Sequence, residues 1–130
     1  MKRQIAAFIA VGSTAALTHM SVVVLLVELL DWHAAVSNIA GFGVAFSVSF
    51  NGHARYTFPQ PAEQRAEACR RFILIAMTSF SLNQIIYTYA LILFGPVFYI
   101  PLLAVVLLGV AVFTFTMSRY WAFALRSKAA

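Results

Sequence analysis

Two nine-residue segments, 65 positions apart, carry the side chains best suited to bind an anion. They read FNGHARYTF at 50–58 and FTMSRYWAF at 115–123, and each begins and ends with phenylalanine. The polar and aromatic candidates are Arg55 and Tyr56 in the first copy and Arg119 and Trp121 in the second. A guanidinium group offers a planar fork of donors to a phosphate, and an aromatic ring can stack on a sugar. The alternative is that both residue types only anchor helix ends at a membrane surface.

Two other polar groups lie in the middle of long apolar stretches. His19 and Asn83 become equivalent when the sequence is shifted by 64 positions. An unpaired polar group in hydrocarbon is costly and often functional, so both are candidates for hydrogen bonds to sugar hydroxyls. The alternative is an ordinary bond between helices, worth about 0.6 kcal/mol on average. Gln84 is turned about 100 degrees from Asn83 on a helix, so we do not include it.

The sequence offers little for catalysis or metal binding. The histidines at 19, 33 and 53 are dispersed, and neither a His-Glu-x-x-His motif nor a glycine-rich phosphate loop occurs. The chain has one cysteine, Cys69, which excludes an internal disulfide and a cysteine pair for a metal. We therefore expect no enzymatic activity, no bound metal and no other cofactor.

The composition assigns most of the chain to lipid. Of 130 residues, 62% are hydrophobic and 10% are charged, which leaves more apolar surface than a soluble domain of this size can bury. A membrane-spanning helix needs about 20 mostly apolar residues. Four stretches meet this requirement, at about 5–30, 34–52, 72–94 and 102–123. We predict an all-α membrane protein, one domain over 1–130 with four transmembrane helices and a hydrophilic loop at about 53–71.

The basic residues predict how the chain is oriented. They precede the first span, lie between the second and third, or lie at and beyond the end of the fourth, whereas the connections 31–33 and 95–101 contain no Lys or Arg. By the positive-inside rule, both termini and the loop are cytoplasmic in a multi-pass protein of the cytoplasmic (inner) membrane. The net charge of +5 then reflects topology and anionic lipid, and we expect no nucleic-acid partner. Arg70 and Arg71 of the loop are further candidates for binding a phosphate.

The second span carries two parallel stripes. Small residues recur every four positions at Ser37, Gly41, Ala45 and Ser49, and an aromatic row runs beside them at Phe42, Phe46 and Phe50. Residues four apart share one helix face, and small residues let helices approach closely in lipid. The small stripe is therefore predicted to meet a neighbouring helix, with the aromatic row facing lipid or an acyl chain. Ordinary packing within a bundle also explains both stripes.

The repeated segment suggests that the two halves of the chain are copies. Each half contains two spans, so both must enter the membrane from the same side, and their pseudo-two-fold axis would run along the membrane normal. We predict two tandem hairpins of the same orientation. Four helices are too few to enclose a hydrophilic tunnel for a sugar. A groove open to lipid, a homodimer, or both are expected instead.

The four spans, the opening FIAVGSTAALTH at 8–19 and the two hairpin ends together resemble the GtrA-like family over roughly 3–123. Members usually show Asn-Arg-Arg-Trp-Thr-Phe, or a close variant, at the two hairpin ends. This chain reads HARYTF at 53–58 and SRYWAF at 118–123. An arginine, an aromatic residue and the final phenylalanine are retained, and the asparagine is replaced both times.

The resemblance implies a role in cell-surface polysaccharide biosynthesis. It suggests that the protein translocates, or flips, a polyprenyl-phosphate-linked sugar across the membrane. The alternative is an adaptor that recruits or orients a polyprenyl-phosphate glycosyltransferase without transport. Expected partners are the lipid-linked sugar, membrane lipid, a glycosyltransferase and a second copy of the chain. A proton-coupled multidrug exporter fits less well, because Glu28 lies too near the outer end of the first span.

Overall fold

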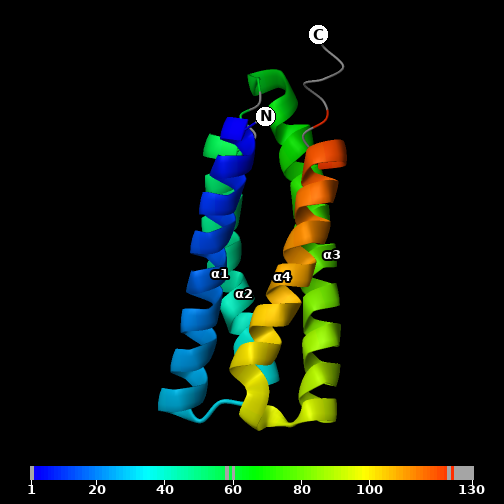
Figure 1. Ribbon diagram of the computed structural model, residues 1–130. Helices are drawn as coiled ribbons and strands as arrows, with labels where there is room; N and C mark the ends of the chain where they lie inside the picture. Colours follow the sequence, from blue (N-terminus) through cyan, green and yellow to red (C-terminus); the bar gives the residue numbers. More distant parts are fainter. Residues whose placement is uncertain (1, 58, 60, 123, 125–130) are drawn as a thin grey trace.

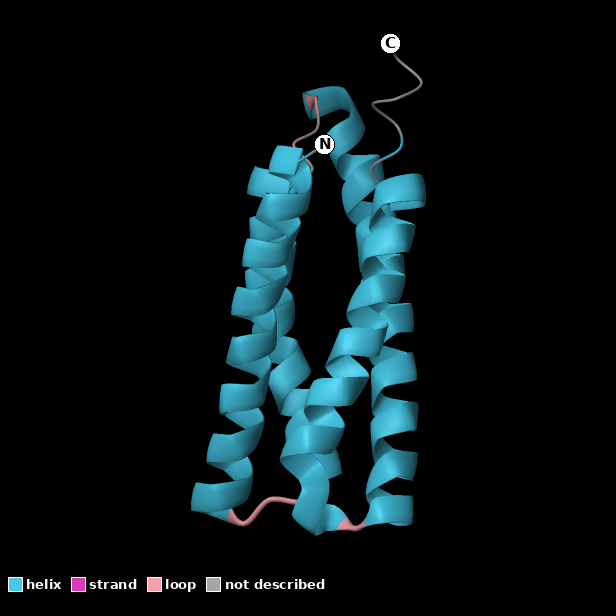
Figure 2. Ribbon diagram, viewed as in Figure 1, coloured by secondary structure: helices cyan, strands magenta, loops and turns pink. Residues whose placement is uncertain are grey.

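The computed structural model describes residues 2–57, 59, 61–122 and 124, and these are almost entirely helical, without a strand (Figure 2). The long helices are α1 (Lys2–Leu30), α2 (Ala34–Gly52), α3 (Ala62–Phe94) and α4 (Tyr99–Met117). The short elements are the π-helical turns η1 (His53–Thr57) and η3 (Ser118–Ala122) and the 3₁₀ turn η2 (Pro96–Phe98). Together they give four helices long and apolar enough to cross a membrane. The predicted all-α membrane fold is confirmed.

The four helices lie as two antiparallel pairs. α1 packs mainly on α2, and α3 packs mainly on α4 (Figure 1). The N-terminus and the start of α3 lie at one end of the bundle, which also carries most of the basic residues and is called the basic end below. At the opposite end α4 begins close to the first pair and diverges from it toward the basic end (Figure 1). Duplication of one ancestral hairpin stays a prediction.

Two tight turns close the end away from the basic residues. α1 stops at Asp31, whose φ of 53° is left-handed, and the Trp32 N–H donates to the Leu26 carbonyl at 3.1 Å. This bond satisfies one carbonyl of the last turn of α1, and aspartate tolerates the left-handed conformation better than most side chains do. Gly95, with φ of 92°, ends α3 in a conformation that favours glycine. Both turns are short, so each hairpin pairs neighbouring helices.

The helices extend beyond the spans expected from hydropathy. The predicted loop at 53–71 is helical at both of its ends, because η1 continues α2 and α3 begins at Ala62. Glu67 accepts hydrogen bonds from both Arg70 and Arg71, and such i+3 and i+4 pairs stabilise the first turns of α3. α4 also starts three residues early. Pro101 is tolerated there because N–H groups in a first turn have no intrahelical acceptor.

The outer surface is apolar, as a lipid environment requires. Large aliphatic side chains are more than half exposed on every long helix, including Leu25, Ile39, Ile92 and Leu108. The buried hydrophobic residues form two separate clusters. One lies near the short turns and contains Val23, Tyr87, Leu91, Tyr99 and Leu103. The other lies at the basic end and contains Ala68, Phe72, Ile75 and Ala122.

The predicted small-residue stripe of α2 is the surface that meets α1. Ser37, Gly41 and Ala45 are buried. A β-carbon placed on Gly41 would lie 2.7 Å from His19 Cδ2 and 3.0 Å from the His19 carbonyl oxygen. Only glycine fits at this distance, because the carbonyl belongs to a helix backbone that cannot move by itself.

Replacing Gly41 by alanine is expected to destabilise the bundle by about 1–3 kcal/mol, as overpacking does. Gly43, two residues along the same helix, is the matched control because a β-carbon there meets nothing within 4 Å. Gly43→Ala should leave stability unchanged or raise it by up to about 1 kcal/mol through helix propensity. Unfolding in detergent micelles, followed by circular dichroism, measures both. Equal effects of the two substitutions would contradict the close α1–α2 contact.

Candidate functional site

A groove lies between the two helix pairs, in the space between the two hydrophobic clusters. It has a volume of about 170 Å³ and receives side chains from all four long helices. Most of its lining is apolar, with Phe42, Phe46 and Phe80 on one wall. The Phe42 and Phe80 rings stack with centroids 4.1 Å apart, which joins α2 to α3. Its most polar part is formed by His19 and Asn83, both more than nine-tenths buried.

His19 and Asn83 are joined through a third residue, Asn38. The Asn38 Oδ1 lies 2.7 Å from His19 Nε2, and the Asn38 Nδ2 donates to Asn83 Oδ1 at 2.7 Å. The same nitrogen donates to Gln84 Oε1 at 2.7 Å, and Gln84 Nε2 donates to the Ala35 carbonyl at 3.0 Å. This polar network ties α1, α2 and α3 together. Asn38 itself is fully buried.

The network fixes the hydrogen positions. Both hydrogens of the Asn38 amide go to acceptor oxygens, so its Oδ1 faces His19 and must accept. His19 therefore donates from Nε2 to Asn38 Oδ1. Asn83 uses only its oxygen here. Its NH₂ group makes no hydrogen bond to the described part of the chain, and the residue lines the groove. A ligand in the groove would find an amide donor there.

The sequence predicted two members of this network and missed two. His19 and Asn83 both bond to Asn38 of α2, which is the ordinary bond between helices stated as the alternative to sugar binding. Asn38 was overlooked, yet an asparagine within an apolar span is the same signal that identified Asn83. Gln84 was excluded because it points away from Asn83. Its longer side chain still reaches the same amide.

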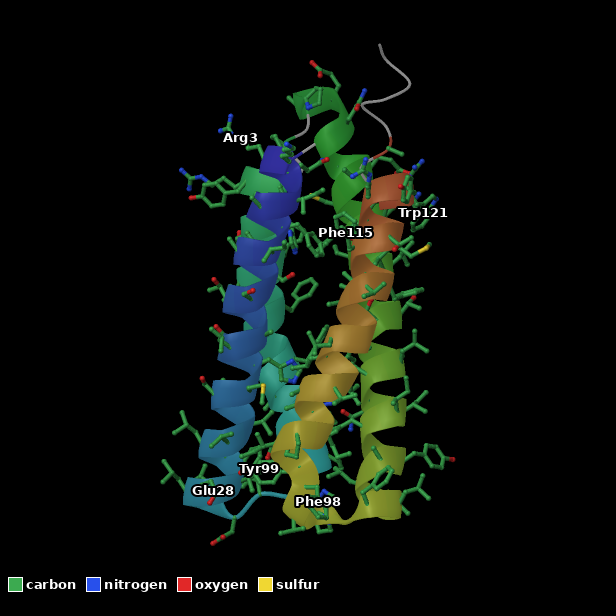
Figure 3. All side chains as sticks on the ribbon, in the orientation of Figure 1. Arg3, Glu28, Phe98, Tyr99, Phe115 and Trp121 are labelled. Carbon is green, nitrogen blue, oxygen red and sulfur yellow. The ribbon has the colours of Figure 1, made fainter. Side chains whose placement is uncertain are left out.

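Aromatic rings close the groove toward the basic end. Phe8 of α1 stacks on His53 of η1 with centroids 4.7 Å apart, and it meets the edge of Phe115 of α4 at 4.6 Å. Phe115 points into the space between the helix pairs (Figure 3). His53, which stands where the family usually has asparagine, is buried and lies 2.9 Å from Thr57 Oγ1 through Nδ1. This aromatic gate, Phe8, His53, Phe72 and Phe115, separates the groove from the cytoplasm-facing surface expected at this end.

Arg55 and Arg119 lie at the same end of the bundle but not at equivalent positions. The turns η1 and η3 are 65 residues apart and show the same burial: ends buried, centre exposed. In that register Arg55 matches Tyr120, and Tyr56 matches Trp121. Each arginine instead stacks on its next neighbour, Arg55 on Tyr56 at 5.6 Å and Arg119 on Tyr120 at 5.5 Å. Neither arginine lines the groove.

Arg70 and Arg71 are engaged within the protein. Both donate to the Glu67 carboxylate, at 2.8 Å for the shortest contact of each. Arg71 also donates to the Trp121 carbonyl at 3.1 Å and lies over the Trp121 ring, 5.6 Å from its centroid. Figure 3 shows Trp121 at the basic end. Arg71 thus ties α3 to η3.

Asn38→Ala is expected to lower the free energy of unfolding by about 1–3 kcal/mol, because the buried His19 and Asn83 and the half-buried Gln84 lose a partner. Asn51 is the matched control on the same helix. It is exposed and bonds only to the Ser47 carbonyl of its own helix, so Asn51→Ala should change stability by less than about 0.5 kcal/mol. Denaturation in micelles tests the difference. A mild effect at Asn38 would mean that the network does not hold the helices.

Comparison with known proteins adds one finding to this geometry. Residues 7–123 match the family model described as GtrA/DPMS, transmembrane domain, which covers nearly the whole chain, including the groove and the polar network. None of the curated proteins and none of the solved structures matches. The family and the four helices make this a multi-pass membrane protein of glycosylation-related function. The chain belongs to the GtrA/DPMS transmembrane-domain family.

Proposed function

We propose that the protein helps a polyprenyl-phosphate-linked sugar pass between the leaflets of the cytoplasmic membrane. The observation that supports this is the groove, which places a buried amide donor, Asn83, deep inside an apolar bundle. The family match supports the same class of function. The proposal includes no chemical step, so the protein acts as a transporter rather than an enzyme.

The energetic obstacle for such a lipid is its sugar. Each hydroxyl that enters hydrocarbon without a partner costs about 4–8 kcal/mol. The Asn83 amide can donate to a hydroxyl, and the hydroxyls of Ser49, Ser79 and Thr114 at the groove lining add further polar atoms. The phenylalanine wall offers faces on which the less polar side of a sugar ring can stack. The groove therefore lowers the barrier without enclosing a water-filled tunnel.

The tail and the phosphate of the lipid meet different surroundings. The long apolar tail remains in the bilayer, because the groove lies between the helix pairs and its volume suits a small head. The phosphate starts at the basic end, where the interfacial arginines provide a positive potential, and it follows the sugar to which it is bonded across the membrane. Entry from that end requires the rings of the aromatic gate to turn aside, since Phe8 and His53 are stacked across it.

This proposal places both termini and the basic end in the cytoplasm. Cys69 is the single cysteine and is partly exposed near the start of α3. A membrane-impermeant maleimide should label it only after cells are permeabilised. In a Cys69→Ser background, Trp32→Cys at the opposite end should label in intact cells, because Trp32 is exposed in the α1–α2 turn. Labelling of Cys69 in intact cells would reverse the orientation.

Filling the groove should stop transfer without unfolding the protein. Gly12 lines the groove, and a β-carbon there meets nothing within 4 Å, so Gly12→Leu adds bulk to the groove itself. The leucine side chain occupies volume that the sugar would need. If this overpacking costs about 1–3 kcal/mol of binding free energy, the affinity for the sugar falls about tenfold or more, and transfer falls with it. Leaflet transfer of a labelled polyprenyl-phosphate sugar in vesicles containing only the purified protein measures this.

The control is Gly109→Leu, since Gly109 has equal space for a β-carbon but lies outside the groove lining. It should transfer the lipid at the wild-type rate. If both variants transfer equally, the groove is not the path. If the purified wild-type protein transfers nothing, the adaptor role replaces transport, and recruitment of a glycosyltransferase becomes the activity to measure.

A further inference from the structure

A second groove lies on the outside of the first helix pair. Its volume is about 410 Å³, and it is lined by Ala10, Val11 and Thr14 of α1 and by Val48, Asn51 and Gly52 of α2, with Arg55 and Tyr56 at its rim. It shares no lining residue with the groove between the pairs. The α1 residues of the two grooves lie on opposite faces of that helix, so this outer groove opens to lipid.

Small residues line the outer groove, and at its base they let the two helices lie close together. A β-carbon on Gly52 would lie 2.5 Å from Val11 Cγ1, so the α2 backbone rests directly on α1. Thr14 and Asn51, on its two walls, donate to carbonyls of their own helices, at 2.8 Å each. Apart from Arg55 and Tyr56 at the rim, the outer groove is therefore an apolar channel. It has room because Ala10 and Gly52 have small side chains or none.

Arg55 brings an unneutralised charge to the rim. Its side chain is exposed, and its guanidinium makes no hydrogen bond or ion pair within the described residues. The chain has four acidic residues. Glu28 and Asp31 lie at the far end of the bundle, and Glu67 pairs with Arg70 and Arg71. Glu63 lies at the basic end, in the first turn of α3, and makes no ion pair with Arg55. The exposed Lys2 and Arg3, at the start of α1, add positive charge at the same end (Figure 3).

We propose that the outer groove is a binding site for an anionic glycerophospholipid of the leaflet at the basic end. The Arg55 guanidinium donates to the lipid phosphate, and one acyl chain lies along Ala10, Thr14 and Val48. A planar fork of donors above an apolar channel matches a phosphate that carries a fatty chain. Anionic phospholipids are abundant in the cytoplasmic leaflet, so mass action favours them over a scarce carrier lipid.

Arg119 of η3 provides a matched control for Arg55. Arg119 also stacks on the tyrosine that follows it, at the same end of the bundle, yet it does not line the outer groove. Retention of phosphatidylglycerol by the purified full-length protein is measured by native mass spectrometry and by lipid titration of thermal stability. Arg55→Gln should weaken the affinity about tenfold, and Arg119→Gln should leave it unchanged.

A second pair of variants tests the channel without altering charge. Ala10→Leu fills the outer groove and should weaken phosphatidylglycerol binding, whereas Ala6→Leu, on an exposed part of α1 outside the lining, should not. Phosphatidylcholine, with the same chains and no net charge, should bind weakly to every variant.

Three results would overturn this proposal. These are unchanged phosphatidylglycerol affinity in Arg55→Gln, equal losses in Arg55→Gln and Arg119→Gln, and displacement of phosphatidylglycerol by an isoprenyl phosphate at equal concentration. The last result would assign the groove to the carrier lipid instead. Because the two grooves share no residue, Gly12→Leu should retain the phospholipid while losing transfer, which separates this site from the proposed transport.

Discussion

The hydrogen bonds of the Asn38 amide hold α1, α2 and α3 at one depth of the bundle, and the groove forms beside them. In lipid no hydrophobic force draws helices together, so close packing and buried hydrogen bonds decide which faces meet. Gly41 lets α2 approach α1 at the level of His19, and this approach brings Asn38 within reach of the imidazole. The network then recruits Asn83 and Gln84 from the second pair. The network thereby places polar atoms inside a bundle whose interior would otherwise be entirely apolar.

The groove between the helix pairs exists because the buried hydrophobic residues form two separate clusters with space between them. One cluster seals the end with the short turns, where Tyr87 donates to the Tyr99 carbonyl at 3.0 Å and the Tyr99 hydroxyl donates to Glu28. The other cluster and the aromatic gate seal the basic end. Rings can rotate with less disruption than a helix backbone can move. In the proposed transport, the gate is therefore the part of the boundary that would turn aside, at the positive end of the bundle.

The interfacial arginines have different physical environments, although their sequence contexts look alike. Arg71 pairs with Glu67 of its own helix and joins α3 to η3 by donating to the Trp121 carbonyl, so its charge is already used in holding the bundle. Arg55 stands at a lipid-facing groove without a carboxylate partner among the described residues. Charge alone does not distinguish these roles. The distinction comes from which helix face each arginine occupies and from whether an acidic residue lies one turn away.

The class of the protein follows from local features of its amino-acid sequence. Apolar runs of membrane length, the small stripe of α2 and the family pattern are local or periodic properties, and they correctly indicated four helices, a helix contact on the small stripe and the family. The membership of the polar network and the separation of two grooves were decided only by tertiary structure. They depend on how each helix is rotated about its axis, and a shift of one residue turns a side chain by about 100 degrees. For that reason Arg55 and Arg119, which differ by one position in the repeat, occupy different surroundings.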